Sequence, residues 1–247
     1  MPYDAILCET VMITGHDGDA IEAYAARPLD GTPRGGVIVI HHMPGYDAGT
    51  KEITRSFAAH GYNAVMPNLY WREAPGAAPD DAAAEARARG GVPDERLVGD
   101  AQGAMNYLKQ LSNSNGKVAC IGYCSGGRQA WLANGSLPLD AAIVCYGAFI
   151  VGETPATLPA RANLAHLATS MSGPVLGMFG NDDVYPTPAQ VDELEGLLRD
   201  AGKPHEFHRY DGVGHSFFSV ERTAYRPEAA VDGWEKIWAF LDRTLAG

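Results

Sequence analysis

A cysteine flanked by glycines, between a predicted strand and a predicted helix, restricts the fold of this chain more than any other feature. Residues 122–127 read Gly-Tyr-Cys-Ser-Gly-Gly. They follow the apolar run Val-Ala-Cys-Ile at 118–121 and open a helical pattern. A reactive side chain in so sharp a strand-to-helix turn leaves no room for a Cβ two residues before or after it, so both places require glycine. The spacing predicts a strained turn that holds Cys124 at the edge of a sheet.

Cys124 is the predicted nucleophile of this turn. The start of the following helix directs amide dipoles at the sulfur and favours the thiolate, and the Ser125 N–H is placed to hold an oxyanion. One alternative is a buried structural thiol in a glycine-rich turn. The other is Ser125 as nucleophile, but Ser125 is flanked by Tyr123 and Gly127, which breaks the double-glycine rule. Cys124 is therefore preferred.

The rest of the chain alternates between strand and helix patterns. Apolar or alternating runs predict strands at residues 5–14, 20–26, 36–41, 63–67, 117–122, 141–146, 174–179 and 205–210. Other runs predict helices at 50–60, 94–111, 126–134, 188–201 and 228–245, with a partly helical surface excursion at 76–91. This alternation predicts a doubly wound, mostly parallel α/β sheet with antiparallel strands at the N-terminus. No second core is evident, so residues 1–247 are expected to form a single domain.

An acid and a base follow the cysteine in the order that this kind of turn uses. Asp182 and Asp183 come directly after the strand at 174–179, where ligands bind at the carboxyl edge of a sheet. His215 lies in a glycine-flanked loop after the strand at 205–210 and is the expected general base. The alternative role for one of the two aspartates is to cap the helix that begins near residue 188.

Composition narrows the classes of partner and cofactor. The formal net charge is −11 over 247 residues, which argues against nucleic-acid binding. No apolar run is long enough to span a bilayer and no signal peptide is evident, so a cytoplasmic protein without a membrane partner is expected. The cysteines lack metal-ligand spacing, so we expect free thiols and neither a metal nor a cofactor.

Five segments of the chain together resemble the dienelactone hydrolase family of the α/β-hydrolase superfamily. They are Val-Ile-Val-Ile-His-His-Met-Pro-Gly (37–45), Pro-Asn-Leu-Tyr-Trp-Arg-Glu-Ala-Pro-Gly (67–76), the segment ending in Gly-Tyr-Cys-Ser-Gly-Gly (114–127), Gly-Asn-Asp-Asp-Val-Tyr-Pro (180–186) and Gly-His-Ser-Phe (214–217). The resemblance covers nearly the whole chain and implies an α/β-hydrolase fold. It also implies a triad of Cys124, His215 and Asp183, with Met43 N–H joining Ser125 N–H as an oxyanion donor.

The chain departs from the family pattern beside the nucleophile and at the site for a substrate carboxylate. His42 stands where the best-known members have glutamate, and His41 precedes it. Side chains alternate at the end of a strand, so one of the two histidines is expected to face the site, and the family match favours His42. The family's carboxylate-binding arginine corresponds to Ser219, with Arg222 nearby.

Several other side chains are candidates for lining or tuning the pocket, with packing in the core as the alternative for each. They are Tyr70, Trp71, Arg72, Tyr123 and Phe149. Aromatic rings suit a planar or hydrophobic acyl group.

The resemblance implies a carboxymethylenebutenolidase-like enzyme that hydrolyses a small lactone or enol ester through an acylated Cys124. One alternative is a carboxylesterase or thioesterase that acts on an unrelated substrate at the same site. The other is a non-catalytic, ligand-binding relative. An esterase or thioesterase would be distinguished by the substrates that it hydrolyses. A non-catalytic relative would show ordinary thiol reactivity at Cys124.

Overall fold

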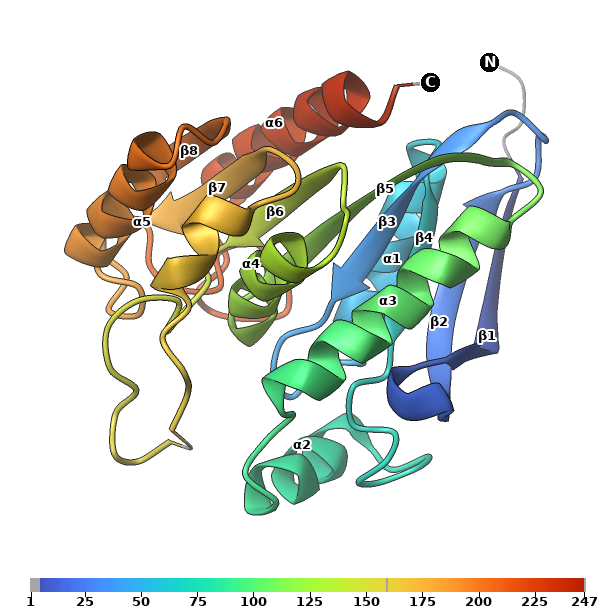
Figure 1. Ribbon diagram of the computed structural model, residues 1–247, viewed down its shortest axis with the longest axis horizontal. Helices are drawn as coiled ribbons and strands as arrows, with labels where there is room; N and C mark the ends of the chain where they lie inside the picture. Colours follow the sequence, from blue (N-terminus) through green and yellow to red (C-terminus); the bar gives the residue numbers. More distant parts are fainter. Residues whose placement is uncertain (1–4, 159, 247) are drawn as a thin grey trace.

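The strands form one sheet in the order β1-β2-β4-β3-β5-β6-β7-β8 in the computed structural model, which describes residues 5–158 and 160–246 (Figure 1). The strands are β1 Ile6–Thr14, β2 Ala20–Pro28, β3 Arg34–Ile40, β4 Asn63–Pro67, β5 Ser114–Tyr123, β6 Ala141–Cys145, β7 Val175–Gly180 and β8 His205–Tyr210. The helices are α1 Ala48–Ala59, α2 Pro79–Ala88, α3 Asp94–Gln110, α4 Ser125–Ser136, α5 Pro188–Asp200 and α6 Pro227–Leu245. Two short 3₁₀ helices, His16–Gly18 and Ala165–Ser170, complete the described elements.

The strand pairing follows from the pattern of side chains. β1 pairs with β2 and β2 with β4 in antiparallel fashion. The remaining pairs, from β4–β3 through to β7–β8, are parallel. The central strands β4, β6 and β7 are buried along their whole length, as expected for strands covered on both faces. The predicted doubly wound sheet with antiparallel N-terminal strands is confirmed.

Helices cover both faces of the sheet. Helices α3, α4 and α5 lie on the near face in Figure 1, and α1 and α6 lie behind it. One core cluster joins the near-face helices through residues such as Leu97, Trp131 and Leu194. A second cluster joins Phe57 of α1 and Ile237 of α6 to the other face. Burial on both sides holds the carboxyl ends of the strands, where the candidate site lies, in a fixed arrangement.

The predicted elements are present with boundaries that differ by a few residues. The excursion at 76–91 contains α2, whose Ala82, Ala83 and Ala86 are buried. The 3₁₀ helix Ala165–Ser170 was not predicted, because a single short turn has no periodic apolar pattern. In the described part of the chain, no helix is both long and apolar enough to cross a membrane.

Candidate active site

The turn between β5 and α4 has the strained geometry that the glycine spacing predicts. Cys124 has φ 57° and ψ −119°, a conformation that side-chain-bearing residues rarely adopt. A Cβ on Gly122 would lie 1.9 Å from the Gly126 carbonyl oxygen, and one on Gly126 would lie 2.3 Å from the Ile40 carbonyl oxygen. Glycine is therefore required at both positions, because the neighbouring atoms belong to the backbone.

Hydrogen bonds hold the backbone of this turn in place. The Cys124 N–H donates to the Cys145 carbonyl oxygen at 3.1 Å, which ties the turn to the end of β6. The Cys124 carbonyl in turn accepts the Gly127 N–H at 2.9 Å. Within the described residues, the N–H groups of Ser125 and Met43 donate to no protein acceptor. The Ser125 amide at the start of α4 and the Met43 amide in the loop after β3 can stabilise negative charge that develops beside Cys124.

His215 and Asp183 form a close pair at the same edge of the sheet. His215 Nδ1 lies 2.7 Å from Asp183 Oδ2. The Asp183 side chain is 1% exposed and the His215 side chain 30% exposed, so the acid is buried while the imidazole reaches the surface. Asp183 also accepts the Tyr185 N–H at 2.9 Å, which fixes the carboxylate. This arrangement orients the ring and leaves its other nitrogen free for proton transfer.

Asp182 does not pair with His215, and the cap of α5 is not the residue that the sequence suggested. Asp182 is exposed, and its side chain makes no hydrogen bond to the described residues. Neither aspartate caps α5, because Thr187 takes that position and forms a reciprocal capping box with Gln190. Asp182 and Asp183 instead lie in the turn after β7, several residues before the helix begins. The alternative that one of them is the cap was wrong.

The environment of His215 favours the imidazolium. Burial opposes protonation, but interactions with the Asp183 carboxylate and the Cys124 sulfur outweigh it and raise the pKa of His215 to about 10. The buried ring of Tyr146 packs edge-on against the imidazole, with 5.0 Å between ring centroids. Sequence reasoning missed Tyr146, whose position just after β6 gave the only signal.

His42 has a carboxylate partner that was not anticipated. Its Nε2 lies 3.2 Å from Asp47 Oδ2. Asp47 is the N-cap of α1 and forms a capping box with Thr50. Burial alone would raise the pKa of Asp47, but its contacts with His42 and the Thr50 N–H hold that pKa well below its usual range. A second histidine–aspartate pair thus lies beside the strand end that carries Met43.

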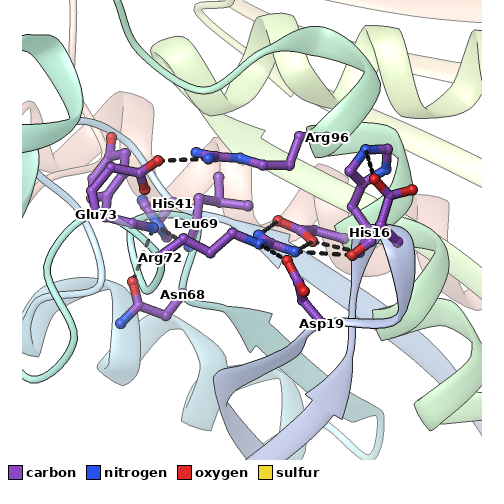
Figure 2. A network of polar contacts seen from close by, with 11 residues as sticks. His16, Asp19, His41, Asn68, Leu69, Arg72, Glu73 and Arg96 are labelled. Atoms are coloured by element: carbon purple, nitrogen blue, oxygen red, sulfur yellow. Dashed lines mark hydrogen bonds and ion pairs between the residues drawn. The ribbon is translucent and has the colours of Figure 1, made fainter. Parts of the chain in front are cut away.

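His41 is buried and hydrogen-bonded to the scaffold, and the tuning role considered for it stays a prediction. It is 1% exposed, its Nε2 accepts the Leu69 N–H at 3.2 Å, and its Nδ1 lies 2.9 Å from the His42 carbonyl oxygen (Figure 2). Because Nε2 accepts, the proton belongs on Nδ1. Burial lowers the pKa of His41 to about 4, so the ring is neutral at physiological pH.

Arg72 is likewise bonded to the scaffold. Its guanidinium lies 2.9 Å from both carboxylate oxygens of Asp100 and 2.7 Å from Asp19 Oδ2. Figure 2 shows the side chain extended toward Asp19. The next residue, Glu73, pairs with Arg96 at 2.5 Å. Both arginines are engaged by acids of the scaffold, which supports the structural alternative for Arg72. A contact of Arg72 with substrate stays a prediction.

The aromatic candidates divide between the site and the core. Tyr70 is 4% exposed, and its pKa is raised mainly by burial, with the Cys124 charge adding to the rise, so it is a neutral phenol near the nucleophile. Trp71 packs against the core under α3, whereas Tyr123 is buried in the core of the opposite face. Phe149 packs against Tyr185 with 5.1 Å between ring centroids.

The fold and this edge of the sheet define a class of protein. A strained cysteine turn after β5, an acid after β7 and a histidine after β8 are the arrangement of the α/β-hydrolase fold. The sequence profile of the dienelactone hydrolase family matches residues 21–245. The chain belongs to the dienelactone hydrolase family, and the expectation of a hydrolase of the ester and lactone class is confirmed at that level.

Individual relatives agree with the family assignment. A Yersinia pestis protein assigned as a carboxymethylenebutenolidase is 32% identical over 225 residues, which cover 89% of this chain and 82% of the relative. One from Escherichia coli K12, assigned the same way, is 31% identical over 243 residues, or 96% of this chain and 87% of the relative.

Solved structures of similar proteins have the same fold. A Klebsiella pneumoniae structure assigned as a dienelactone hydrolase superposes with a TM-score of 0.84 at 28% identity, covering 95% of this chain and 98% of that chain. A dienelactone hydrolase-like promiscuous phosphotriesterase from metagenomic libraries superposes with a TM-score of 0.77 at 19% identity, covering 98% of this chain and all of that chain. The second likeness concerns the fold alone.

Proposed function

We propose that this enzyme hydrolyses a lactone or an enol ester through an acylated Cys124, with His215 and Asp183 completing the triad. The observation that carries the proposal is the 2.7 Å pair between His215 and Asp183, at the sheet edge where Cys124 is presented in a strained turn. The names of the relatives support the lactone as substrate class, because several are assigned as carboxymethylenebutenolidases.

Acylation begins when the Cys124 sulfur attacks the carbonyl carbon of the ester. The oxyanion that forms is held by the N–H groups of Ser125 and Met43. Its collapse breaks the bond between the carbonyl carbon and the alkoxy or enolic oxygen, and His215 gives its proton to that oxygen. For a lactone, the released hydroxyl or enol stays attached to the acyl group, because the bond that breaks lies within a ring.

Deacylation repeats these steps with water as the nucleophile. His215 accepts a proton from water, whose oxygen adds to the thioester carbonyl of acyl-Cys124. The second oxyanion collapses with cleavage of the carbon–sulfur bond, which releases the acid and restores the thiolate. Asp183 keeps the imidazole in one orientation through both stages and stabilises the imidazolium.

The test is a comparison of two cysteine substitutions on a panel of lactones and activated esters. Cys124→Ala is expected to abolish turnover. Cys120→Ala is the matched control, because Cys120 is fully buried in β5 and donates to the Ala130 carbonyl oxygen. Full turnover in Cys124→Ala would contradict the proposal.

A further inference from the structure

A cavity of about 220 Å³ lies beside the candidate active site, between α1, α6 and the loop at residues 218–222. Apolar side chains form much of its wall, including Ile53 of α1, Phe218 of the loop and Trp234 of α6. It is on the α1 and α6 face of the sheet, whereas Tyr70 and α2 lie toward the α3 face. The mechanism described above does not use this cavity.

Three of the segments that line the cavity are adjacent in sequence to proposed catalytic residues. Tyr123 lines it and directly precedes Cys124. His42 lines it and directly precedes Met43, one of the proposed oxyanion donors. The loop that begins with Phe218 follows His215 by three residues. A group in the cavity would therefore be close to the reacting atoms.

Two polar atoms in the wall lack hydrogen-bond partners. The Tyr123 hydroxyl, on a side chain that is 2% exposed, has no partner among the described residues. The same is true of His42 Nε2, which is at ion-pair distance from Asp47 without the geometry of a hydrogen bond. His42 still has its charge contact with Asp47, so the Tyr123 hydroxyl is the unpaired group of this wall. Such a buried group costs about 1–3 kcal/mol, and an occupant with a polar atom beside it would recover part of that cost.

The charges at the cavity argue against an anionic occupant. Asp47, Glu52 and Glu221 line it, and Arg222 is its one arginine or lysine among the described lining residues. An added carboxylate would meet more negative than positive groups. An uncharged, mainly apolar group of the size of a single ring fits both the walls and the charges.

We propose that this cavity is the subsite for the alcohol, or leaving-group, part of the substrate, and that it selects an uncharged ring-sized substituent. The inference rests on the proposed function, because His215 must donate its proton to the leaving oxygen. That oxygen has to lie within hydrogen-bond reach of His215, so its substituent starts beside the loop that carries Phe218. The cavity is the space next to that loop.

Ile53→Trp tests the subsite, because the larger side chain fills the cavity from α1. Two acetate esters are compared, methyl acetate and benzyl acetate, whose alcohols are of similar acidity but different size. The ratio of kcat/KM for the benzyl ester to that for the methyl ester is expected to fall roughly tenfold or more. Ile53→Ala, which enlarges the cavity, is expected to leave this ratio equal or raise it.

Val231→Trp is the matched surface control, since Val231 lies on α6, is 57% exposed and does not line the cavity. It should leave the ratio unchanged. A second pair, methyl acetate and methyl phenylacetate, varies the acyl part, and Ile53→Trp should not change that ratio.

Two kinds of result would overturn the inference. If Ile53→Trp changed only the ratio for the two esters that differ in their acyl part, the cavity would hold the acyl group. If it changed neither ratio, the cavity would not take part in substrate binding. If the unmodified enzyme hydrolyses none of the esters or lactones offered, the proposed function itself fails. Turnover without the expected shift contradicts only the subsite.

Discussion

Cys124 combines an unfavourable backbone conformation with a partly exposed side chain. A side-chain-bearing residue at φ 57° and ψ −119° costs about 1–3 kcal/mol, and such strain persists only where the surrounding structure enforces it. Here the Cys145 carbonyl and the close packing of Gly126 against β3 supply that constraint. The same geometry brings the sulfur near the imidazole of His215. The strained turn thus holds the sulfur at the position that the proposed reaction would use.

The two adjacent aspartates make a matched pair of substitutions. Asp183→Asn is expected to lower kcat by a factor on the order of 10³–10⁴, because the imidazole loses the carboxylate that orients it and stabilises its protonated form. Asp182→Asn should change kcat by less than about twofold, since surface side chains without partners contribute little. Steady-state kinetics on one activated ester measures both. Equal losses in the two variants would contradict the assignment of Asp183.

His41 should make the protein sensitive to acid. Its pKa is lowered from 6.5 in the unfolded chain to about 4 in the folded one, so the unfolded state binds the proton more tightly. Stability is therefore lost as the pH falls from about 6.5 toward 4. At pH 4.5 the loss from this group is about 2–3 kcal/mol.

His41→Gln isolates that contribution, because an amide can accept from the Leu69 N–H and donate to the His42 carbonyl as the ring does. The free energy of unfolding, measured with urea at pH 7 and 4.5, should fall less in the variant than in the unmodified protein. An equal fall in both would show that His41 does not carry the acid sensitivity.

At the level of single residues, sequence reasoning singled out candidate side chains but not all of their partners. The glycine spacing singled out Cys124, and chain order pointed to His215. The choice of Asp183 over Asp182 came from the family resemblance. Asp47 was missed as the partner of His42. It lies five residues further along the chain and caps α1, and its closeness to His42 depends on where β3 ends and α1 begins, which the sequence pattern does not define.

Helix α4 differs from α5 in the space around its glycines. A Cβ on Gly126, in the first turn of α4, would lie 2.3 Å from a backbone oxygen of β3. A Cβ on Gly196, in the interior of α5, would have the end of the Arg199 side chain as its nearest neighbour, at 3.5 Å. One glycine is required by packing, and the other only lowers helix propensity.

The matched substitutions are Gly126→Ala and Gly196→Ala. Gly126→Ala should destabilise the protein by about 1–3 kcal/mol and lower activity, because the turn or the end of β3 has to move. Gly196→Ala should stabilise it by up to about 1 kcal/mol, since alanine favours the helix. Urea unfolding measures both, and a neutral Gly126→Ala would contradict the account of the turn.

The elements were predictable in type because their apolar patterns are strong, and less so in their ends. Helix α1 begins at Ala48, two residues before the predicted start, because Asp47 caps it. The cap of α5 is Thr187, although the aspartates upstream were also candidates. Such choices depend on which side chain the folded backbone brings to the helix end.

Across the whole molecule, a buried ion pair links segments that are distant in sequence. Arg72 follows β4, Asp100 lies in α3, and the His16 N–H, between β1 and β2, donates to Asp100 Oδ1 at 2.9 Å (Figure 2). Asp100 is fully buried. Removal of Arg72 would leave this carboxylate without its charge partner in the low-dielectric interior.

Arg72→Met should therefore lower the free energy of unfolding by about 3–5 kcal/mol. Arg89→Met is the control, because Arg89 and its partner Glu85 are largely exposed and such pairs contribute at most about 1 kcal/mol. Thermal or urea unfolding of both variants gives the comparison. Similar small losses would show that the Arg72 pair is not important for stability.

The architecture of the whole chain could be predicted because strand and helix patterns alternate through nearly all of it. The buried strands and the position of the cysteine turn determine where the sheet edge carries reactive groups. The cavity beside that edge could not be predicted, since it is formed by α1, α6 and a loop that meet only in the folded molecule. Its volume depends on packing between residues more than 150 positions apart in the sequence. A local sequence pattern carries no information about such contacts.

In the proposed mechanism, catalysis passes through an acyl group on Cys124. Brief exposure to an activated ester or lactone, followed by acid quenching and mass spectrometry of the intact protein and its peptides, tests this most directly. We expect an added mass equal to the acyl group on the peptide that contains Cys124, and no such mass in Cys124→Ala. Turnover accompanied by an adduct on Ser125, or turnover that survives in Cys124→Ala, would contradict it.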